Sequence, residues 1–82
     1  MSLEKNIRLG NLFDLYGPLL SKNQYDIMND FLNNDLTLTE VAENRGITRQ
    51  AVKDVVSKVE KKLEDYENKL HFSAKLRELK GE

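Results

Sequence analysis

The stretch TLTEVAENRGITRQAV, residues 37–52, constrains the fold more than any other part of the chain. Thr37 and Glu40 have the spacing of a capping box, in which the threonine hydroxyl and the glutamate carboxylate each accept an amide proton at the start of a helix. Gly46 stands where a chain leaving that helix needs a positive φ, a conformation that is easy only for glycine. Thr48 is placed to cap a second helix. The stretch therefore predicts two helices joined by a glycine turn.

The apolar residues of this stretch are spaced so that they meet in one core. The first helix is predicted from about residue 38 to residue 44, with Val41 and Ala42 facing inward. We expect Ile47 to fill the turn and Val52 to enter the core from the second helix. Helices arranged in this way form a helix-turn-helix, whose second helix can lie in the major groove of DNA with its N-terminal side chains forward.

Two further helices are predicted before this motif. Apolar residues recur at helical spacing from about residue 3 to residue 16, and Gly17-Pro18 then ends the helix. Ser21 and Gln24 form another capping box, which opens the next helix. The same aromatic residues could line a ligand pocket, but helical spacing of this kind is typical of a core. The side chains that these two helices are expected to bury are Leu9, Leu12, Phe13, Tyr16, Tyr25, Met28, Phe31 and Leu32.

A long helix is predicted after the motif. Its apolar residues are four or three positions apart, as in a heptad seam: Val52, Val56, Val59, Leu63, Tyr66 and Leu70. The seam extends beyond what a small three-helix core covers, so its distal half needs either the first helix folded against it or a second copy of the chain. We predict a homodimer and assign the dimer or partner seam to Val59, Leu63, Tyr66 and Leu70.

The heptad seam ends near residues 71–73. Phe72, Leu76 and Leu79 begin a shifted apolar row, which indicates a break in the helix. A short last helix is expected to follow the break, with Ser73 as its cap.

With 82 residues the chain has room for one small domain, and we assign residues 1–82 to a single all-α helix-turn-helix domain. Its helix-turn-helix core is predicted at about 37–62, and a C-terminal helical extension at about 63–82. The sequence has no cysteine, no signal-peptide run and no stretch of membrane-spanning length. We expect a cytoplasmic protein that does not insert into a membrane.

Charge is distributed unevenly, although the formal net charge is only −1. Residues 1–44 sum to −4, residues 45–62 to +4 and residues 63–82 to −1. The basic segment coincides with the turn and the second helix of the motif, where phosphate contacts are needed. From the charge alone, lysines dispersed for solubility are an equally good interpretation. The candidate DNA-binding residues are Arg45, Thr48, Arg49, Gln50, Lys53 and Lys58.

Two of these candidates have the chemistry to read bases. Arg49 can donate a bidentate pair to guanine, and Gln50 can pair with adenine. The other candidates can reach phosphates. Asp54 lies one turn beyond Gln50, where it repels phosphate unless it accepts a hydrogen bond from a cytosine amino group.

No residue pattern supports catalysis. His71 is the one histidine and stands in no motif, so we interpret it as a helix-end residue. Glu64, Asp65 and Glu67 are close in sequence but occupy successive positions of a polar helix, and they are expected to form a solvated face. Zinc-ligand spacing, a phosphate-binding glycine loop and a nucleophile elbow are all missing from the sequence. We predict a non-enzyme without a metal or cofactor.

The motif and the helix after it resemble region four of bacterial sigma factors, the part that reads the upstream promoter element, and this implies a fold of the winged-helix-like superfamily. With LFDLYGPLL at residues 12–20 and LEDYENKL at residues 63–70, the chain more closely resembles the YlxM-type family of small bacterial helix-turn-helix proteins. The resemblance covers about residues 3–70. The family usually has an aromatic residue in place of Lys53 and a polar residue in place of Val55, so the surface of the second helix is altered here.

The resemblance implies two possible functions. Proteins of this family are typically encoded beside components of the signal recognition particle pathway. The first function is that of a regulator that binds double-stranded DNA by placing the helix that starts at Thr48 in a major groove. The second is that of a protein-interaction module, which acts on the signal recognition particle GTPase or its RNA and keeps the helix-turn-helix as a scaffold. Asp54 and the acidic remainder of the chain favour the second function.

Overall fold

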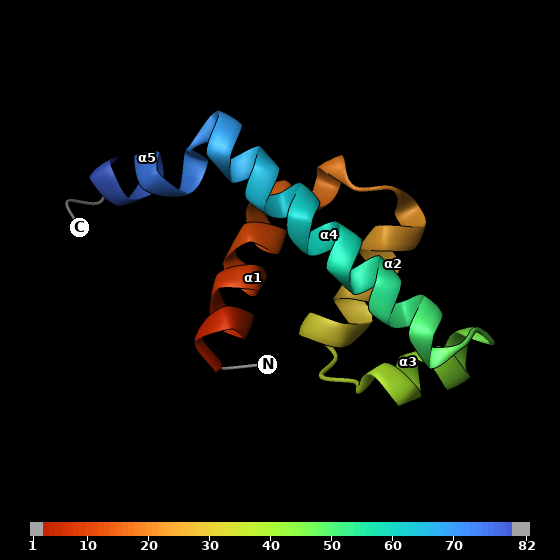
Figure 1. Ribbon diagram of the computed structural model, residues 1–82. Coiled ribbons are helices and arrows are strands. Elements are labelled where there is room, and N and C mark those ends of the chain that lie inside the picture. The colour runs from red at the N-terminus through yellow and green to blue at the C-terminus, as the bar shows by residue number, and fades with distance from the viewer. Residues whose placement is uncertain (1–2, 80–82) are drawn as a thin grey trace.

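Helices account for most of residues 3–79, the part of the chain that this computed structural model describes. No strand occurs within these residues, so the predicted all-α class is confirmed. Figure 1 shows the elements in chain order: α1 (Leu3–Tyr16), the short 3-10 helix η1 (Gly17–Leu19), α2 (Lys22–Leu32), α3 (Leu38–Arg45), α4 (Arg49–Leu70) and α5 (Phe72–Leu79).

The helix starts are capped as the sequence predicts. Complete capping boxes form at Ser21 and at Thr37. The Thr48 hydroxyl accepts a hydrogen bond from the backbone N–H of Ala51 at 3.0 Å, which caps α4. Gly46 ends α3 with a φ of 65°, in the left-handed region that favours glycine. The capping residues in the sequence therefore predict where α3 begins and ends and where α4 begins.

The hydrophobic core lies along one side of α4, which packs against α1, α2 and α3 (Figure 1). Val52, Val56, Val59 and Leu63 are the buried apolar side chains that α4 contributes. The complete set of buried apolar residues is Leu9, Leu12, Phe13, Tyr16, Leu20, Ile27, Met28, Val41, Ala42, Val52, Val56, Val59 and Leu63.

The distal half of the heptad seam is filled from within the chain, because α1 folds against α4. Val59 and Leu63 are both 0% exposed in the single chain. Their assignment to a dimer or partner seam was therefore wrong: they have no surface left for a second copy. Tyr66 is half-buried and Leu70 is exposed, so these two positions keep accessible surface.

Three details of the predicted core are also corrected. Ile47 does not fill the turn, because it is 40% exposed. Its backbone N–H donates to the Ala42 carbonyl at 3.1 Å, and this hydrogen bond closes the turn. Tyr25 is 38% exposed, although its ring packs on Phe13 with centroids 4.9 Å apart. Ile27, which the predicted stripe left out, is fully buried in α2.

The break after α4 is confirmed and lies at His71. This residue has a φ of 54°, and it redirects the chain between Leu70 and Phe72. Ser73 is not the cap of α5, because it is the second residue of that helix. In Figure 1, α5 extends from the end of α4 that is remote from α3.

Glu67 is buried, contrary to the solvated face predicted for it. Its side chain is 8% exposed, and its Oε1 accepts from the Tyr16 hydroxyl at 2.7 Å and from the Ser73 N–H at 3.2 Å. The Tyr16 oxygen in turn accepts from the Phe72 N–H at 3.2 Å. The backbone N–H groups of Phe72 and Ser73, which have no acceptor within α5, thus donate to side chains of α1 and α4.

Glu64 also departs from the predicted solvated face. Both of its carboxylate oxygens accept from the Arg8 guanidinium at 2.8 Å, which links α4 to α1. The pair lowers the pKa of the Glu64 carboxyl through the hydrogen bond and the charge of Arg8, against the smaller opposing effect of burial.

Candidate nucleic-acid interface

The N-terminal half of α4 presents a continuous exposed surface. Successive helix residues are rotated by about 100°, so the buried Val52 and Val56 direct the residues on the opposite face toward solvent. Gln50 and Asp54 lie near the middle of that outer face, and Lys58 follows one turn later. All three of these residues are exposed.

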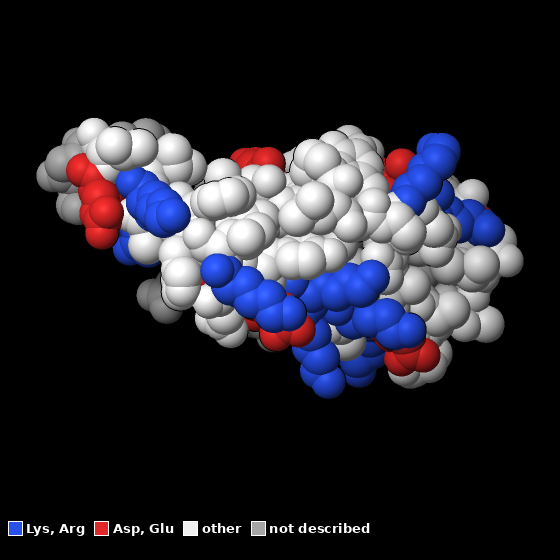
Figure 2. All heavy atoms as spheres, turned by 90° about the horizontal axis from the view of Figure 1, so that it is seen from above, with Lys and Arg blue, Asp and Glu red and all other residues white. Residues whose placement is uncertain are grey.

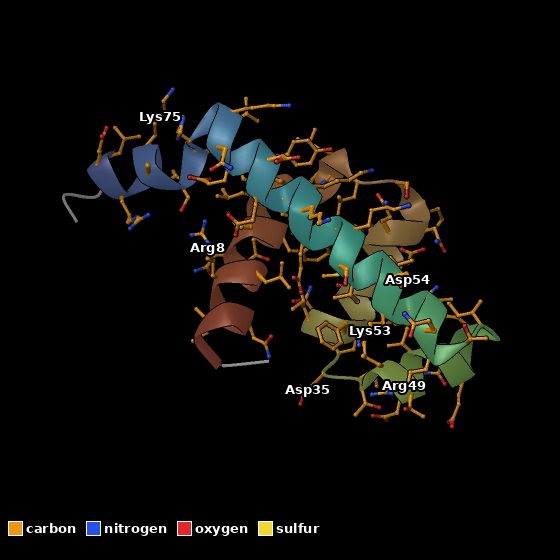
Figure 3. The ribbon with its side chains drawn as sticks, viewed as in Figure 1. Arg8, Asp35, Arg49, Lys53, Asp54 and Lys75 are labelled. Atoms are coloured by element: carbon orange, nitrogen blue, oxygen red, sulfur yellow. The ribbon has the colours of Figure 1, made fainter. Side chains whose placement is uncertain are left out.

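Arg49 and Lys53 flank the outer face on one side. Both side chains are exposed, and among the side chains described, those of residues 6–79, neither has an ion-pair partner. Figure 3 shows Arg49, Lys53 and Asp54 together near the start of α4, far from Arg8 and Lys75. The first turns of α4 therefore offer two uncommitted cations beside an amide and a carboxylate.

Basic side chains gather on the side of the molecule where α4 lies. In Figure 2 most of the blue groups follow the lower edge of the view, which is the side that faces the reader in Figure 1, and a few red groups lie among them. Lys58 and Lys61 are exposed in this part of α4, while the Lys62 ammonium donates to Gln24 Oε1 at 3.2 Å. Lys58 and Lys61 thus add exposed positive charge to this part of α4.

Arg45 has a structural partner that the sequence did not reveal. Its Nη2 and Nε donate to Asp30 Oδ2 at 2.7 and 3.0 Å, which ties the end of α3 to the end of α2. The Asn34 amide donates to the other oxygen of Asp30 at 3.2 Å. Only 29% of the Arg45 side chain remains exposed, so its guanidinium is less available for a phosphate than those of the flanking cations.

Gln50 and Asp54 are joined by a hydrogen bond across one turn of α4. Gln50 Nε2 donates to Asp54 Oδ1 at 2.9 Å. Sequence spacing alone could have indicated this contact, because residues four apart on a helix are neighbours. Gln50, which is predicted to read a base, therefore contacts Asp54, whose negative charge opposes DNA binding.

The structure places most of the predicted interface residues together. Thr48, Arg49, Gln50 and Lys53 lie within the cap and first turns of α4, and Lys58 is about 14 Å farther along the helix than Arg49. Arg45 lies at the end of α3 and is engaged with α2.

Among residues 3–79, no three His, Cys, Asp or Glu side chains converge in a way that could hold a metal ion. No helix within the same residues is long and apolar enough to cross a membrane.

Comparison with known proteins identifies close relatives. The UPF0122 family model, described as "Putative helix-turn-helix protein, YlxM / p13 like", matches residues 3–81. A UPF0122 protein of Limosilactobacillus reuteri is 47% identical over 74 residues, which cover 90% of this chain and 66% of that protein. A UPF0122 protein of Streptococcus pneumoniae is 44% identical over 72 residues, which cover 88% of this chain and 66% of that protein. The chain thus spans about two thirds of the length of these relatives.

Proposed function

Because the chain belongs to the UPF0122 family of YlxM/p13-like helix-turn-helix proteins, we propose that it is a regulator that binds double-stranded DNA through the first turns of α4. The observation that supports this most is the exposed, capped start of α4, where Arg49 and Lys53 are uncommitted and stand beside Gln50. A helix presented in this way fits the major groove with its N-terminal residues against the base edges. Binding to chromosomal DNA would place the protein in the cytoplasm.

Each exposed residue has a role in this proposal. Arg49 donates its two parallel N–H groups to guanine, and Gln50 reads adenine. Thr48 and Lys53 contact phosphates at the edge of the groove. Lys58 contacts a more distant phosphate, because it lies about 14 Å along α4 from Arg49.

The experiment that tests the proposal is fluorescence anisotropy with a pool of random duplexes at several salt concentrations. The two cations assigned to phosphates, Lys53 and Lys58, should give a slope of about −2 for log K against log salt. Arg49→Ala and Lys53→Ala should weaken binding, whereas Lys75→Ala is the matched control, since Figure 3 places Lys75 on α5 far from this surface. Failure of the wild-type protein to bind any duplex at low salt would exclude the proposal.

A second candidate function is favoured by the charge of the same surface. Asp54 is exposed on the outer face of α4, and residues 1–44 carry a net charge of −4. These features suit a protein-interaction module that acts on the signal recognition particle GTPase or its RNA, as the family resemblance implies. Retention of purified particle components that survives Arg49→Ala and Lys53→Ala would favour this function. Absence of retention at low salt would count against it.

Dimerisation is proposed separately, through residues that remain accessible after Val59 and Leu63 are buried. Leu70, Phe72 and Leu76 are 36%, 45% and 41% exposed around the junction of α4 and α5. Pairing of two copies here would cover apolar side chains that the single chain leaves in water. Sedimentation at high concentration tests this, and a species of only 9.5 kDa would contradict it.

A further inference from the structure

The contact between Gln50 and Asp54 determines how the Gln50 amide is oriented. An ionised carboxylate can only accept hydrogen bonds, so the amide nitrogen must face Asp54 and the amide oxygen must face away. The 2.9 Å distance between Gln50 Nε2 and Asp54 Oδ1 agrees with this orientation. Without Asp54, the two ends of the amide could exchange positions by rotation about the last side-chain bond, whose preference is broad.

The oriented amide retains the groups that a base needs. One N–H of Gln50 is used by Asp54, and the second N–H and the carbonyl oxygen remain. A donor and an acceptor side by side match the N7 and N6 positions of adenine in the major groove. An amide held the opposite way would lose this match.

The charge of Asp54 acts in a second way. Asp54 is exposed, and it pairs with no Lys or Arg side chain of residues 6–79. Its carboxylate therefore forms no ion pair at a surface that is proposed to approach phosphates. Such a charge weakens binding to every sequence, while the orientation of Gln50 strengthens binding to the correct one.

We propose that Asp54 is a positioning residue that sets base specificity: it fixes the Gln50 amide for adenine and lowers the affinity for non-cognate DNA. This inference rests on the proposed DNA-binding function. Asp54, whose charge opposes DNA binding in general, then helps the protein to discriminate between DNA sequences. The alternative role is direct acceptance of a hydrogen bond from a cytosine amino group.

The test begins with a site selected from random duplexes by the wild-type protein. Anisotropy then compares the selected duplex with duplexes altered at single base pairs, and Gln50→Ala identifies the pair that Gln50 reads. Asp54→Ala and Asp54→Asn are measured on the same duplexes. Asp65→Ala is the matched control, because Asp65 is also exposed on α4 but lies three turns farther along the helix.

Base preference reports the orientation of the Gln50 amide, and affinity for random duplexes reports the charge of Asp54. Wild-type protein should prefer adenine at the Gln50 position by about fivefold or more, as a good bidentate pair does. Asp54→Ala and Asp54→Asn should both lose most of this preference, because alanine cannot hold the Gln50 amide and asparagine can donate to it as well as accept from it. Both variants should bind random duplexes more tightly than wild type does.

A combined variant distinguishes positioning from direct readout. In a Gln50→Ala background, Asp54→Ala should still raise the affinity for random duplexes but should change no base preference. A change of preference in that background, or full adenine preference in Asp54→Ala alone, would overturn the inference while leaving DNA binding intact. Absence of duplex binding by the wild-type protein would instead overturn the proposed function, and this inference with it.

Discussion

Tyr16→Phe removes one hydroxyl from the buried cluster that joins α1, α4 and α5. Tyr16 is 1% exposed, and its hydroxyl donates to Glu67 at 2.7 Å and accepts from the Phe72 N–H at 3.2 Å. A hydrogen bond to a charged group contributes about 1.5–3 kcal/mol, because its loss leaves a buried carboxylate less well solvated. We expect the free energy of unfolding to fall by about 2 kcal/mol, which lowers the midpoint of thermal unfolding by roughly 10 °C in a domain of this size.

The pH dependence gives this prediction a second readout. Burial raises the pKa of the Glu67 carboxyl, but hydrogen bonds from Tyr16 and from the backbone N–H groups of Ser73 and Ala74 together outweigh it, and the pKa is lowered. A carboxyl whose pKa is lower in the folded state contributes stability above its unfolded pKa of about 4.3, and this is lost as the pH falls through the folded value. Tyr16→Phe should therefore destabilise the protein more at pH 7 than at pH 3.

Urea unfolding monitored by circular dichroism at both pH values measures these effects. Tyr25→Phe is the matched control, because Tyr25 is 38% exposed and its hydroxyl has no hydrogen-bond partner among residues 6–79. The control should change the free energy of unfolding by less than about 0.5 kcal/mol. Equal midpoints for Tyr16→Phe and wild type, or an equal loss at the two pH values, would refute the role given to the Glu67 cluster.

Three further predictions concern the helix-turn-helix. Gly46→Ala should cost about 1–2 kcal/mol in urea unfolding, since the φ of 65° opposes a side chain although no atom would obstruct the added Cβ. Arg45→Met should cost about 1–2 kcal/mol in the same assay by breaking the partly buried pair with Asp30, and an unchanged midpoint would show that the pair does not fix α3. Arg49→Ala should weaken binding to a selected duplex by about 1–3 kcal/mol and relax its specificity, whereas Lys58→Ala should weaken all duplexes alike.

The sequence predicts the helix-turn-helix well because its signals are local. The capping boxes at Ser21 and Thr37, the cap at Thr48 and the turn at Gly46 each depend on residues no more than a few positions apart. The contact between residues 50 and 54 is equally local and follows from helical spacing. The start of α4 could therefore be derived before any tertiary contact was known.

The C-terminal half of α4 could not be derived in the same way, because its surroundings come from the other end of the chain. Tyr16 and Glu67 are 51 positions apart, and Arg8 and Glu64 are 56 positions apart. The heptad pattern predicts that Val59 is buried but does not say whether α1 or a second chain buries it. The choice of partner is a tertiary property, and for this reason the assignment of Val59 and Leu63 to a dimer seam is wrong.

The residues of α4 that support folding are different from those that are proposed to bind DNA. The buried residues of α4 pack against α1, α2 and α3, so a substitution among them affects the packing of all four helices. The exposed residues at its start are held by the Thr48 cap and by contacts within the helix, such as that between Gln50 and Asp54. Substitutions at residues 49, 50, 53 and 54 can therefore change the proposed DNA-binding surface with little effect on the core. This makes the surface suited to the comparison of base specificity between variants.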